Sequence, residues 1–119
     1  MQLTNITKIK LTSLQEETLK EYNINSEYSY ICKKLDIKPI TLSKVLQSLK
    51  IKGLIDNGEI TNLGKELLNY LSFRNETILK FMHISNLNDK ELYQELQKLD
   101  LEIIIAIKNL LNHWSFTFI

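Results

Sequence analysis

The chain is poor in the residues that form tight turns and cross-links. Its 119 residues include three Gly, one Pro and one Cys. So little Gly and Pro leaves little room for the many turns of an all-β fold, and favours helices joined by short loops. The lone Cys32 cannot form a disulfide within the chain, which fits a reducing compartment. We therefore expect a mainly α protein in the cytoplasm.

Long apolar runs and catalytic motifs are also missing. The longest run, residues 103–107, is far shorter than a membrane span, and the residues after Met1 do not resemble a signal peptide. The sequence has no Gly-rich phosphate loop, no nucleophile elbow and no metal-hydrolase motif. Neither His83 nor His113 has a nearby Ser, Cys or Asp in a catalytic arrangement. We expect no membrane partner and no enzymatic activity.

Positive charge is concentrated in one short segment, although the net formal charge is only +1. Residues 33–52 hold six lysines and a single acidic residue, Asp36. A surface that faces phosphates carries such a cluster. The alternative explanation is that lysine is simply common in this composition. We favour the phosphate-facing surface, because the cluster coincides with two expected helices. The six are Lys33, Lys34, Lys38, Lys44, Lys50 and Lys52.

Those two helices are expected over residues 27–35 and 39–52, with a short turn between them. Asp36 suits the turn because Asp tolerates the left-handed conformation. Pro39 suits the first helical position, where a backbone N–H is not needed. The apolar residues that repeat at helical spacing are Tyr28, Ile31, Cys32 and Leu35 in the first helix, and Leu42, Val45, Leu46 and Leu49 in the second.

A β-hairpin is predicted directly after the second helix. Gly53 would end that helix, and Asn57-Gly58 is the strongest short-range hairpin signal. Thr61 would cap the next helix, and Gly64 would permit close packing. The hairpin tip is acidic, so we expect it to contact the phosphates of a nucleic acid less readily than the lysine-rich helix does.

Helical spacing also covers the flanking regions. A first helix is expected over residues 14–22, opened by a capping box of Ser13 and Glu16, and Ser26 is a candidate cap for the helix at 27–35. A long helix is expected over 63–82, with a possible break at 72–75. Further helices are expected after Asp89 and over 101–111. The four isoleucines of the last segment leave a strand as the alternative, and the aromatic tail 113–119 could be a strand, a core plug or a partner contact.

Apolar residues after position 63 exceed what a small DNA-binding module needs. Since two-fold DNA sites favour dimeric readers, we expect these helices to form a homodimer interface. A monomer with a thick helical core is the alternative. The expected organisation is a DNA-binding region over 1–64 and a helical dimerisation region over 65–119.

The polar face of the helix at 39–52 carries short hydroxyls, an amide and cations. Such groups bind phosphates and base edges, although an ordinary solvated face would look similar. The hairpin that follows makes DNA the better interpretation. Base-side contacts are expected from Thr41, Ser43, Lys44 and Gln47, and phosphate contacts from Lys38, Lys50 and Lys52. The full set of expected DNA-binding residues is Lys38, Pro39, Thr41, Ser43, Lys44, Gln47, Lys50, Lys52 and Asn57.

The segments LTSLQEETLKEY, GLIDNGEITNLGKELL, RNETILKFMHI and ELYQELQKLDLE, in this order around the helix pair, resemble the diphtheria toxin repressor and manganese transport regulator family over residues 11–111. The helix pair and hairpin are shared with other winged-helix regulators, including the multiple antibiotic resistance regulator family. The resemblance implies a winged helix-turn-helix and a homodimeric transcription regulator, expected to be a repressor, on double-stranded DNA. The chain stops before any SH3-like third domain, as in the shorter manganese-type members.

The resemblance also implies positions for metal ligands, and most of them hold other residues here. The first-helix positions fall near Glu17 and on Lys20, which cannot serve as a ligand. The family's Arg-His motif appears as Arg74-Asn75, without the His. A divalent metal needs several converging donors, so we expect the metal switch to be lost.

The later acidic motif of the family falls on Gln97, Asp100 and Leu101, of which only Asp100 retains a possible ligand. We therefore expect no metal cofactor. Two alternatives stay open: a repressor that depends on Mn, Fe or Zn at a site rebuilt from Glu17, Asp100 and Glu102, and a winged helix used for protein–protein contacts. Cys32 is expected to be a small core residue and His83 a helix-end residue.

Overall fold

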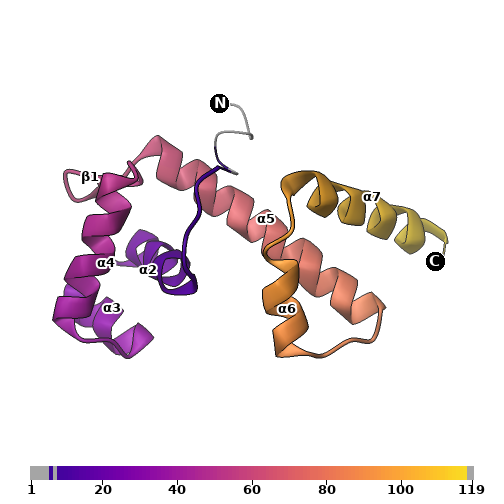
Figure 1. Ribbon diagram of the computed structural model, residues 1–119, viewed down its shortest axis with the longest axis horizontal. Coiled ribbons are helices and arrows are strands. Elements are labelled where there is room, and N and C mark those ends of the chain that lie inside the picture. Colours follow the sequence, from indigo (N-terminus) through magenta and orange to yellow (C-terminus); the bar gives the residue numbers. More distant parts are fainter. Residues whose placement is uncertain (1–5, 7, 118–119) are drawn as a thin grey trace. The chain divides into compact units, whose positions relative to one another are not determined.

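A computed structural model describes residue 6 and residues 8–117, with side chains up to His113. Over this range the protein is mainly helical and has one small antiparallel hairpin (Figure 1). The expectation of a mainly α fold is confirmed. The chain divides into two compact units between Asn69 and Tyr70, here called unit 1 and unit 2. The division falls inside a helix, so the two units share one continuous element of secondary structure.

Three helices build the body of unit 1: α2 (Ser13–Ile24), α3 (Tyr28–Leu35) and α4 (Pro39–Ile51). Each packs against the other two (Figure 1). Their apolar stripes meet in the core, where hydrophobic burial provides most of the stabilisation. The buried residues from these helices include Leu19, Ile31, Leu42, Leu46 and Leu49.

The start of α2 differs from the prediction by one residue. Thr12, not Ser13, is the N-cap: its hydroxyl accepts a hydrogen bond from the Gln15 backbone at 3.2 Å. The Gln15 side chain accepts one from the Thr12 backbone at 2.9 Å, which completes the capping box in place of Glu16. The Gln15 amide also donates to the Ser48 hydroxyl of α4, 2.9 Å away. This tertiary contact favours the register that was found.

The predicted cap of α3 was also wrong. Glu27, not Ser26, is at the N-cap position, and it makes no side-chain capping hydrogen bond. The side-chain oxygen of Asn25 accepts a hydrogen bond from the Glu27 backbone at 3.0 Å. That short-range bond closes the turn, and α3 therefore begins at Tyr28.

Three helices end at a residue in the left-handed conformation. These residues are Asp36 (φ 53°), Gly53 (φ 78°) and Asn86 (φ 56°). In each case the next N–H bonds back to a carbonyl five residues earlier, as in a Schellman motif. The role predicted for Asp36 is confirmed. The bonds run from Ile37 to Cys32 (3.0 Å), from Leu54 to Leu49 (3.0 Å) and from Leu87 to Met82 (2.8 Å).

The predicted hairpin is present. Strands β1 (Ile55–Asp56) and β2 (Glu59–Ile60) are antiparallel, with Ile55 opposite Ile60. Between them, Asn57 and Gly58 have φ values of 51° and 77°. Two successive residues with positive φ match a type I′ turn, whose twist suits a two-residue hairpin.

Helix α5 (Asn62–Ile84) follows the hairpin and is continuous through residues 72–75, so the break considered there is absent. The Thr61 hydroxyl accepts a hydrogen bond from the Gly64 backbone at 3.0 Å and donates one to the Gly53 carbonyl at 2.7 Å. A Cβ at Gly64 would lie 2.4 Å from the Leu54 carbonyl oxygen. The predicted close packing at Gly64 is confirmed.

Unit 2 contains the rest of α5 together with α6 (Lys90–Leu96) and α7 (Leu101–Thr117). Asp89 caps α6 as expected, accepting a hydrogen bond from the Glu91 backbone at 2.9 Å. The strand alternatives for 101–111 and for the start of the tail were wrong, and residues 118–119 lie outside the described residues. Among the described residues, no helix is both long enough and apolar enough to cross a bilayer. The core of this unit contains Ile78, Met82 and Ile104, packed against Phe73, Phe81, Leu92, Tyr93, Leu96 and Leu99.

Candidate nucleic-acid interface

Helix α4 has one buried face and one open face. Leu42, Leu46 and Leu49 point into the core of unit 1. The opposite side is exposed along the whole helix, at positions separated by three or four residues, and these positions share one face since each residue turns the helix by about 100°. The residues of this open face are Ile40, Ser43, Lys44, Gln47, Lys50 and Ile51.

Most residues expected to bind DNA are accessible. Ser43, Lys44, Gln47 and Lys50 lie together on the open face, and Pro39 is exposed at its start. Lys38, at the N-cap of α4, and Asn57, at the hairpin turn, are exposed as well. Every expected contact except Thr41 and Lys52 therefore has an exposed side chain, and none of these side chains forms an intramolecular hydrogen bond with another described residue.

Thr41 and Lys52 are placed less favourably for DNA. Thr41 is only half-exposed and follows Ile40, so it points about 100° away around the helix. The Lys52 ammonium donates to the Lys10 carbonyl oxygen at 2.6 Å and lies 3.4 Å from the Gln15 side-chain oxygen. These bonds tie the C-terminal end of α4 to the segment before α2 and compete with a phosphate contact.

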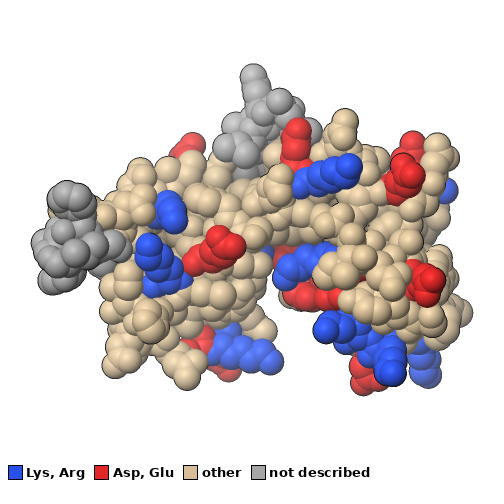
Figure 2. Space-filling view, turned by 180° about the vertical axis from the view of Figure 1, so that it is seen from behind, with Lys and Arg blue, Asp and Glu red and all other residues tan. Residues whose placement is uncertain are grey.

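The lysines of α3 extend the positive surface. Lys33 and Lys34 lie in the last turn of α3, where cations interact favourably with the helix dipole, and Lys38 follows across the turn. All three are exposed. Figure 2 shows basic side chains gathered over the end of unit 1 where α3 and α4 meet. Anionic ligands would therefore be attracted to this end of the unit.

The hairpin tip has the opposite charge. Asp56 and Glu59 form a directly opposed pair in the ladder, and both are exposed. Two carboxylates that directly flank the turn would repel a phosphate backbone. The charge of unit 1 thus changes sign between the α3–α4 turn and the hairpin.

Two isoleucines of the open face were not among the predicted site residues. Ile40 is 64% exposed and Ile51 is 77% exposed. The residues predicted on this face, Ser43, Lys44, Gln47 and Lys50, are all polar or charged. Gln47 is seven residues after Ile40 and four before Ile51, and both separations return to the same side of a helix. This spacing could have predicted from the sequence that both isoleucines share the face of Gln47.

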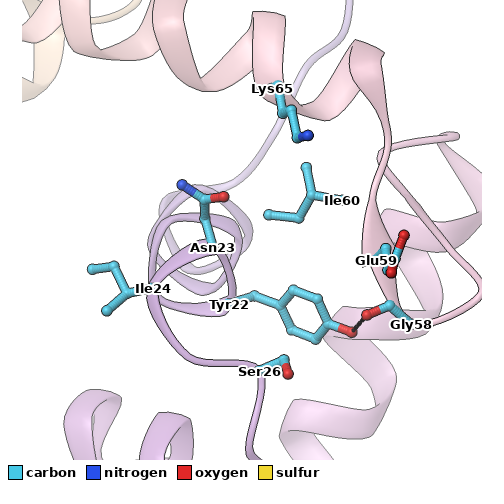
Figure 3. A pocket seen from close by; sticks show the side chains of 8 residues that line it. All are labelled: Tyr22, Asn23, Ile24, Ser26, Gly58, Glu59, Ile60 and Lys65. Carbon is cyan, nitrogen blue, oxygen red and sulfur yellow. Dashed lines mark hydrogen bonds between the residues drawn. The ribbon is translucent and has the colours of Figure 1, made fainter.

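An open hollow of about 430 Å³ lies between the end of α2 and the hairpin (Figure 3). The Tyr22 side chain reaches across the hollow, and its hydroxyl donates a hydrogen bond to the Gly58 carbonyl oxygen at 2.5 Å. Partial burial raises the pKa of Tyr22, and the nearby Tyr28 and Glu59 raise it further. The phenol therefore stays protonated at neutral pH and remains a donor. The lining residues are Tyr22, Asn23, Ile24, Ser26, Gly58, Glu59, Ile60 and Lys65.

The metal-ligand candidates are not gathered within either unit. Glu17 is in unit 1, where it pairs with Lys20 at 3.2 Å, whereas Asp100 and Glu102 are in unit 2. Within the described part of the chain, no group of three or more His, Cys, Asp or Glu side chains is arranged to hold a metal ion. These residues give no basis for a step that uses a metal.

Two positions that the resemblance relates to metal ligands are nevertheless neighbours. The Asn75 side-chain oxygen accepts a hydrogen bond from the Gln97 amide at 3.0 Å. The same oxygen accepts two bonds from the Arg74 guanidinium, at 3.0 and 2.9 Å. Arg74 also donates to the Gln97 backbone carbonyl at 3.4 Å. Hydrogen bonds among neutral amides and a guanidinium thus connect α5 to the end of α6.

Comparisons with known proteins provide no relative. No protein-family model, no curated protein and no solved structure matches the chain. A function must therefore be argued from the geometry of α4, the hairpin and the charges around them.

Proposed function

We propose that the protein is a sequence-specific transcription regulator, expected to be a repressor, that binds double-stranded DNA through a winged helix-turn-helix in unit 1. The observation that carries the proposal is the exposed and mainly polar face of α4, with a lysine-rich turn before it and a type I′ hairpin after it. An α-helix fits the major groove, and its side chains can reach base edges there. Helices α3 and α4 would form the helix pair, and the hairpin would be the wing.

The roles of the side chains follow from their positions. Ser43, Lys44 and Gln47 would face the bases, since they lie in the middle of the exposed face. Lys38 and Lys50, near the two ends of α4, would contact phosphates. The acidic tip would keep the wing from close phosphate contact, so its main role would be to brace α4.

A homodimer would complete the regulator. Unit 2 exposes several large apolar side chains, and exposed apolar surface is often buried in protein–protein contacts. A second copy of the chain would cover them and present two helices α4 to the half-sites of a pseudo-palindrome. The residues are Leu79, Ile84, Leu87, Ile103, Ile105 and Leu110, each between 38% and 55% exposed.

Light scattering at micromolar concentration tests the dimer. We expect a species of twice the 14.0 kDa chain mass. Replacing Leu110, which is 52% exposed, with Lys should shift the protein towards the monomer. A 14.0 kDa species for the unmodified protein would contradict the dimer and leave DNA binding by a monomer to be measured separately.

Selection of bound genomic fragments by the purified protein tests the DNA proposal and supplies the operator. The double variant Lys44→Ala, Gln47→Ala should then lose most of its preference for that operator. Lys38→Ala should reduce the slope of log affinity against log salt by roughly 0.9, the share of one phosphate contact. Lys90→Ala, which removes an exposed cation from α6 in unit 2, is the matched control and should leave the slope unchanged. Failure to retain any duplex at low salt would reject the proposal.

The proposed regulator works without a metal switch. Calorimetric titration with manganese, iron, zinc or cobalt should give no binding heat, and none of these ions should change operator affinity. A metal-dependent affinity would instead support the rebuilt site as the alternative.

A further inference from the structure

The side chain of Ile40 stands out on the open face of α4. It is the second residue of the helix, between Pro39 and Thr41, and it is 64% exposed. Single exposed apolar residues are common on protein surfaces and need no explanation by themselves. Ile40, however, points in nearly the same direction from α4 as Gln47, one of the residues expected to face the bases.

The angular positions around α4 place Ile40 at the centre of this face. With about 100° per residue, Gln47 lies about 20° from Ile40, and Lys44 and Ser43 lie on either side at about 40° and 60°. Thr41, in contrast, lies about 100° away and is half-buried. If α4 faces a groove, Ile40 is therefore closer to the groove floor than any neighbouring polar residue of the first turn.

The chemistry at that position is restricted. The isoleucine side chain has no hydrogen-bond donor or acceptor, and β-branching leaves it few rotamers, so little side-chain entropy is lost on contact. In the major groove, the apolar feature of a base edge is the C5-methyl group of thymine. N-terminal residues of a recognition helix are the ones that contact base edges in helix-turn-helix complexes.

We infer that Ile40 is a specificity-determining residue that contacts a thymine C5-methyl group in the major groove. This inference rests on the proposed function and deepens it, because it names the base that the first turn of α4 selects. Ile51 has the same chemistry, but it is eleven residues along the helix, about 16 Å away, and lies at the C-terminal end. It serves as an internal control for exposed apolar surface.

Uracil substitution tests the contact directly, because deoxyuridine differs from thymidine only by the missing methyl group. Each thymine of the selected operator is replaced in turn in a synthetic duplex, and binding is measured by fluorescence anisotropy. At one position in each half-site, the unmodified protein should lose about fourfold in affinity, the value of one buried methyl group. Ile40→Ala should bind the thymine operator more weakly and show no further loss with uracil at that position.

The controls separate this inference from the proposed function. Ile51→Ala should keep the full sensitivity to uracil at the Ile40 position. Thermal unfolding curves of Ile40→Ala, followed by far-UV circular dichroism, should match those of the parent protein because the replaced side chain is exposed. Tight operator binding with equal affinity for all uracil duplexes would overturn the role of Ile40 and leave the proposed function intact. Equal uracil sensitivity in Ile40→Ala would also overturn it, and absence of binding to any duplex would overturn both.

Discussion

The Tyr22 hydroxyl and the Gly58 carbonyl oxygen are 2.5 Å apart and joined by a hydrogen bond across 36 residues of sequence (Figure 3). The bond connects the C-terminal part of α2 to the turn of the hairpin. Helix α2 also packs against α4, and α4 packs against β1. The hairpin is therefore held from two sides, and its two-residue strands do not have to be stable alone.

Replacing Tyr22 with Phe should weaken this link without creating a cavity. We expect the free energy of unfolding at pH 7 to fall by about 0.5 kcal/mol, the lower part of the range for a hydrogen bond, because the bond is open to solvent although the Tyr22 side chain is partly buried. Urea denaturation followed by far-UV circular dichroism measures the change. An unchanged midpoint would contradict a stabilising role for the bond.

The pH dependence of the same variant follows from linkage. The pKa of Tyr22 is raised in the folded state, chiefly by burial, so the folded protein holds this proton more tightly than the unfolded chain does. Its contribution to stability is fully present below the ordinary value of 10.0 and is lost as the pH rises through the raised pKa. Stability should therefore fall above pH 10, and fall less steeply in Tyr22→Phe. The pKa of Tyr30 is also raised, first by its hydrogen bond to Glu21, so a residual slope should persist until Tyr30→Phe is added.

Replacing Gly64 with Ala should destabilise unit 1. Alanine is the better helix former by roughly 0.5–1 kcal/mol. The new Cβ would, however, lie 2.4 Å from the Leu54 carbonyl oxygen and 2.7 Å from a methyl group of Ile60. Overpacking against backbone costs about 1–3 kcal/mol or more, so the clash should exceed the helix-propensity gain.

Thermal or urea unfolding of Gly64→Ala provides the measurement, with Ser72→Ala as the control. Ser72 is an exposed residue of the same helix, and its replacement should change the free energy of unfolding by less than about 0.5 kcal/mol. A Gly64→Ala protein as stable as the Ser72→Ala protein would contradict the close approach of α5 to the hairpin.

The features of the fold that could be predicted from the sequence are those that depend on residues close together in the chain. The left-handed turn at Asp36, the Asn57-Gly58 hairpin and the cap at Asp89 each depend on residues within a few positions of one another. Helical spacing alone located the buried face of α4 and the buried Ile31 of α3, whereas Tyr28, predicted on the same stripe of α3, is 48% exposed. These features could be predicted because no distant contact competes with them.

Distant contacts explain what could not be predicted. Gln15 rather than Glu16 completes the capping box of α2, and Gln15 also bonds to Ser48, 33 residues later. Lys52 was expected to face phosphates, yet its ammonium binds the carbonyl of Lys10, 42 residues earlier. The exposure of Ile40 in the candidate site is a different case, because its helical spacing to Gln47 already indicates it and no distant contact is involved.

Replacing Thr18 with Val should stabilise the protein. The Thr18 side chain is fully buried, and its hydroxyl has no hydrogen-bond partner among the residues that the structure describes. Valine has nearly the same shape and removes the cost of desolvating an unpaired hydroxyl, so we expect a gain of about 1 kcal/mol in the free energy of unfolding. Thr18→Ser is the control: it keeps the hydroxyl, loses a buried methyl group and should be less stable than the parent. A destabilised Thr18→Val protein would indicate that the hydroxyl has a partner in solution.

Replacing Asn75 with Leu tests the network that connects α5 and α6 in unit 2. The substitution removes an acceptor from Gln97 and from Arg74, whose side chain is only 6% exposed. A hydrogen bond to a charged group is worth about 1.5–3 kcal/mol, and we expect a loss within that range by urea denaturation. Gln97→Ala removes only the neutral bond and should cost less, about 1 kcal/mol. In the double variant the two losses should not add, because both single changes break the same bond. Additive losses would mean that Asn75 and Gln97 act independently, and that Arg74 alone orients the Asn75 side chain.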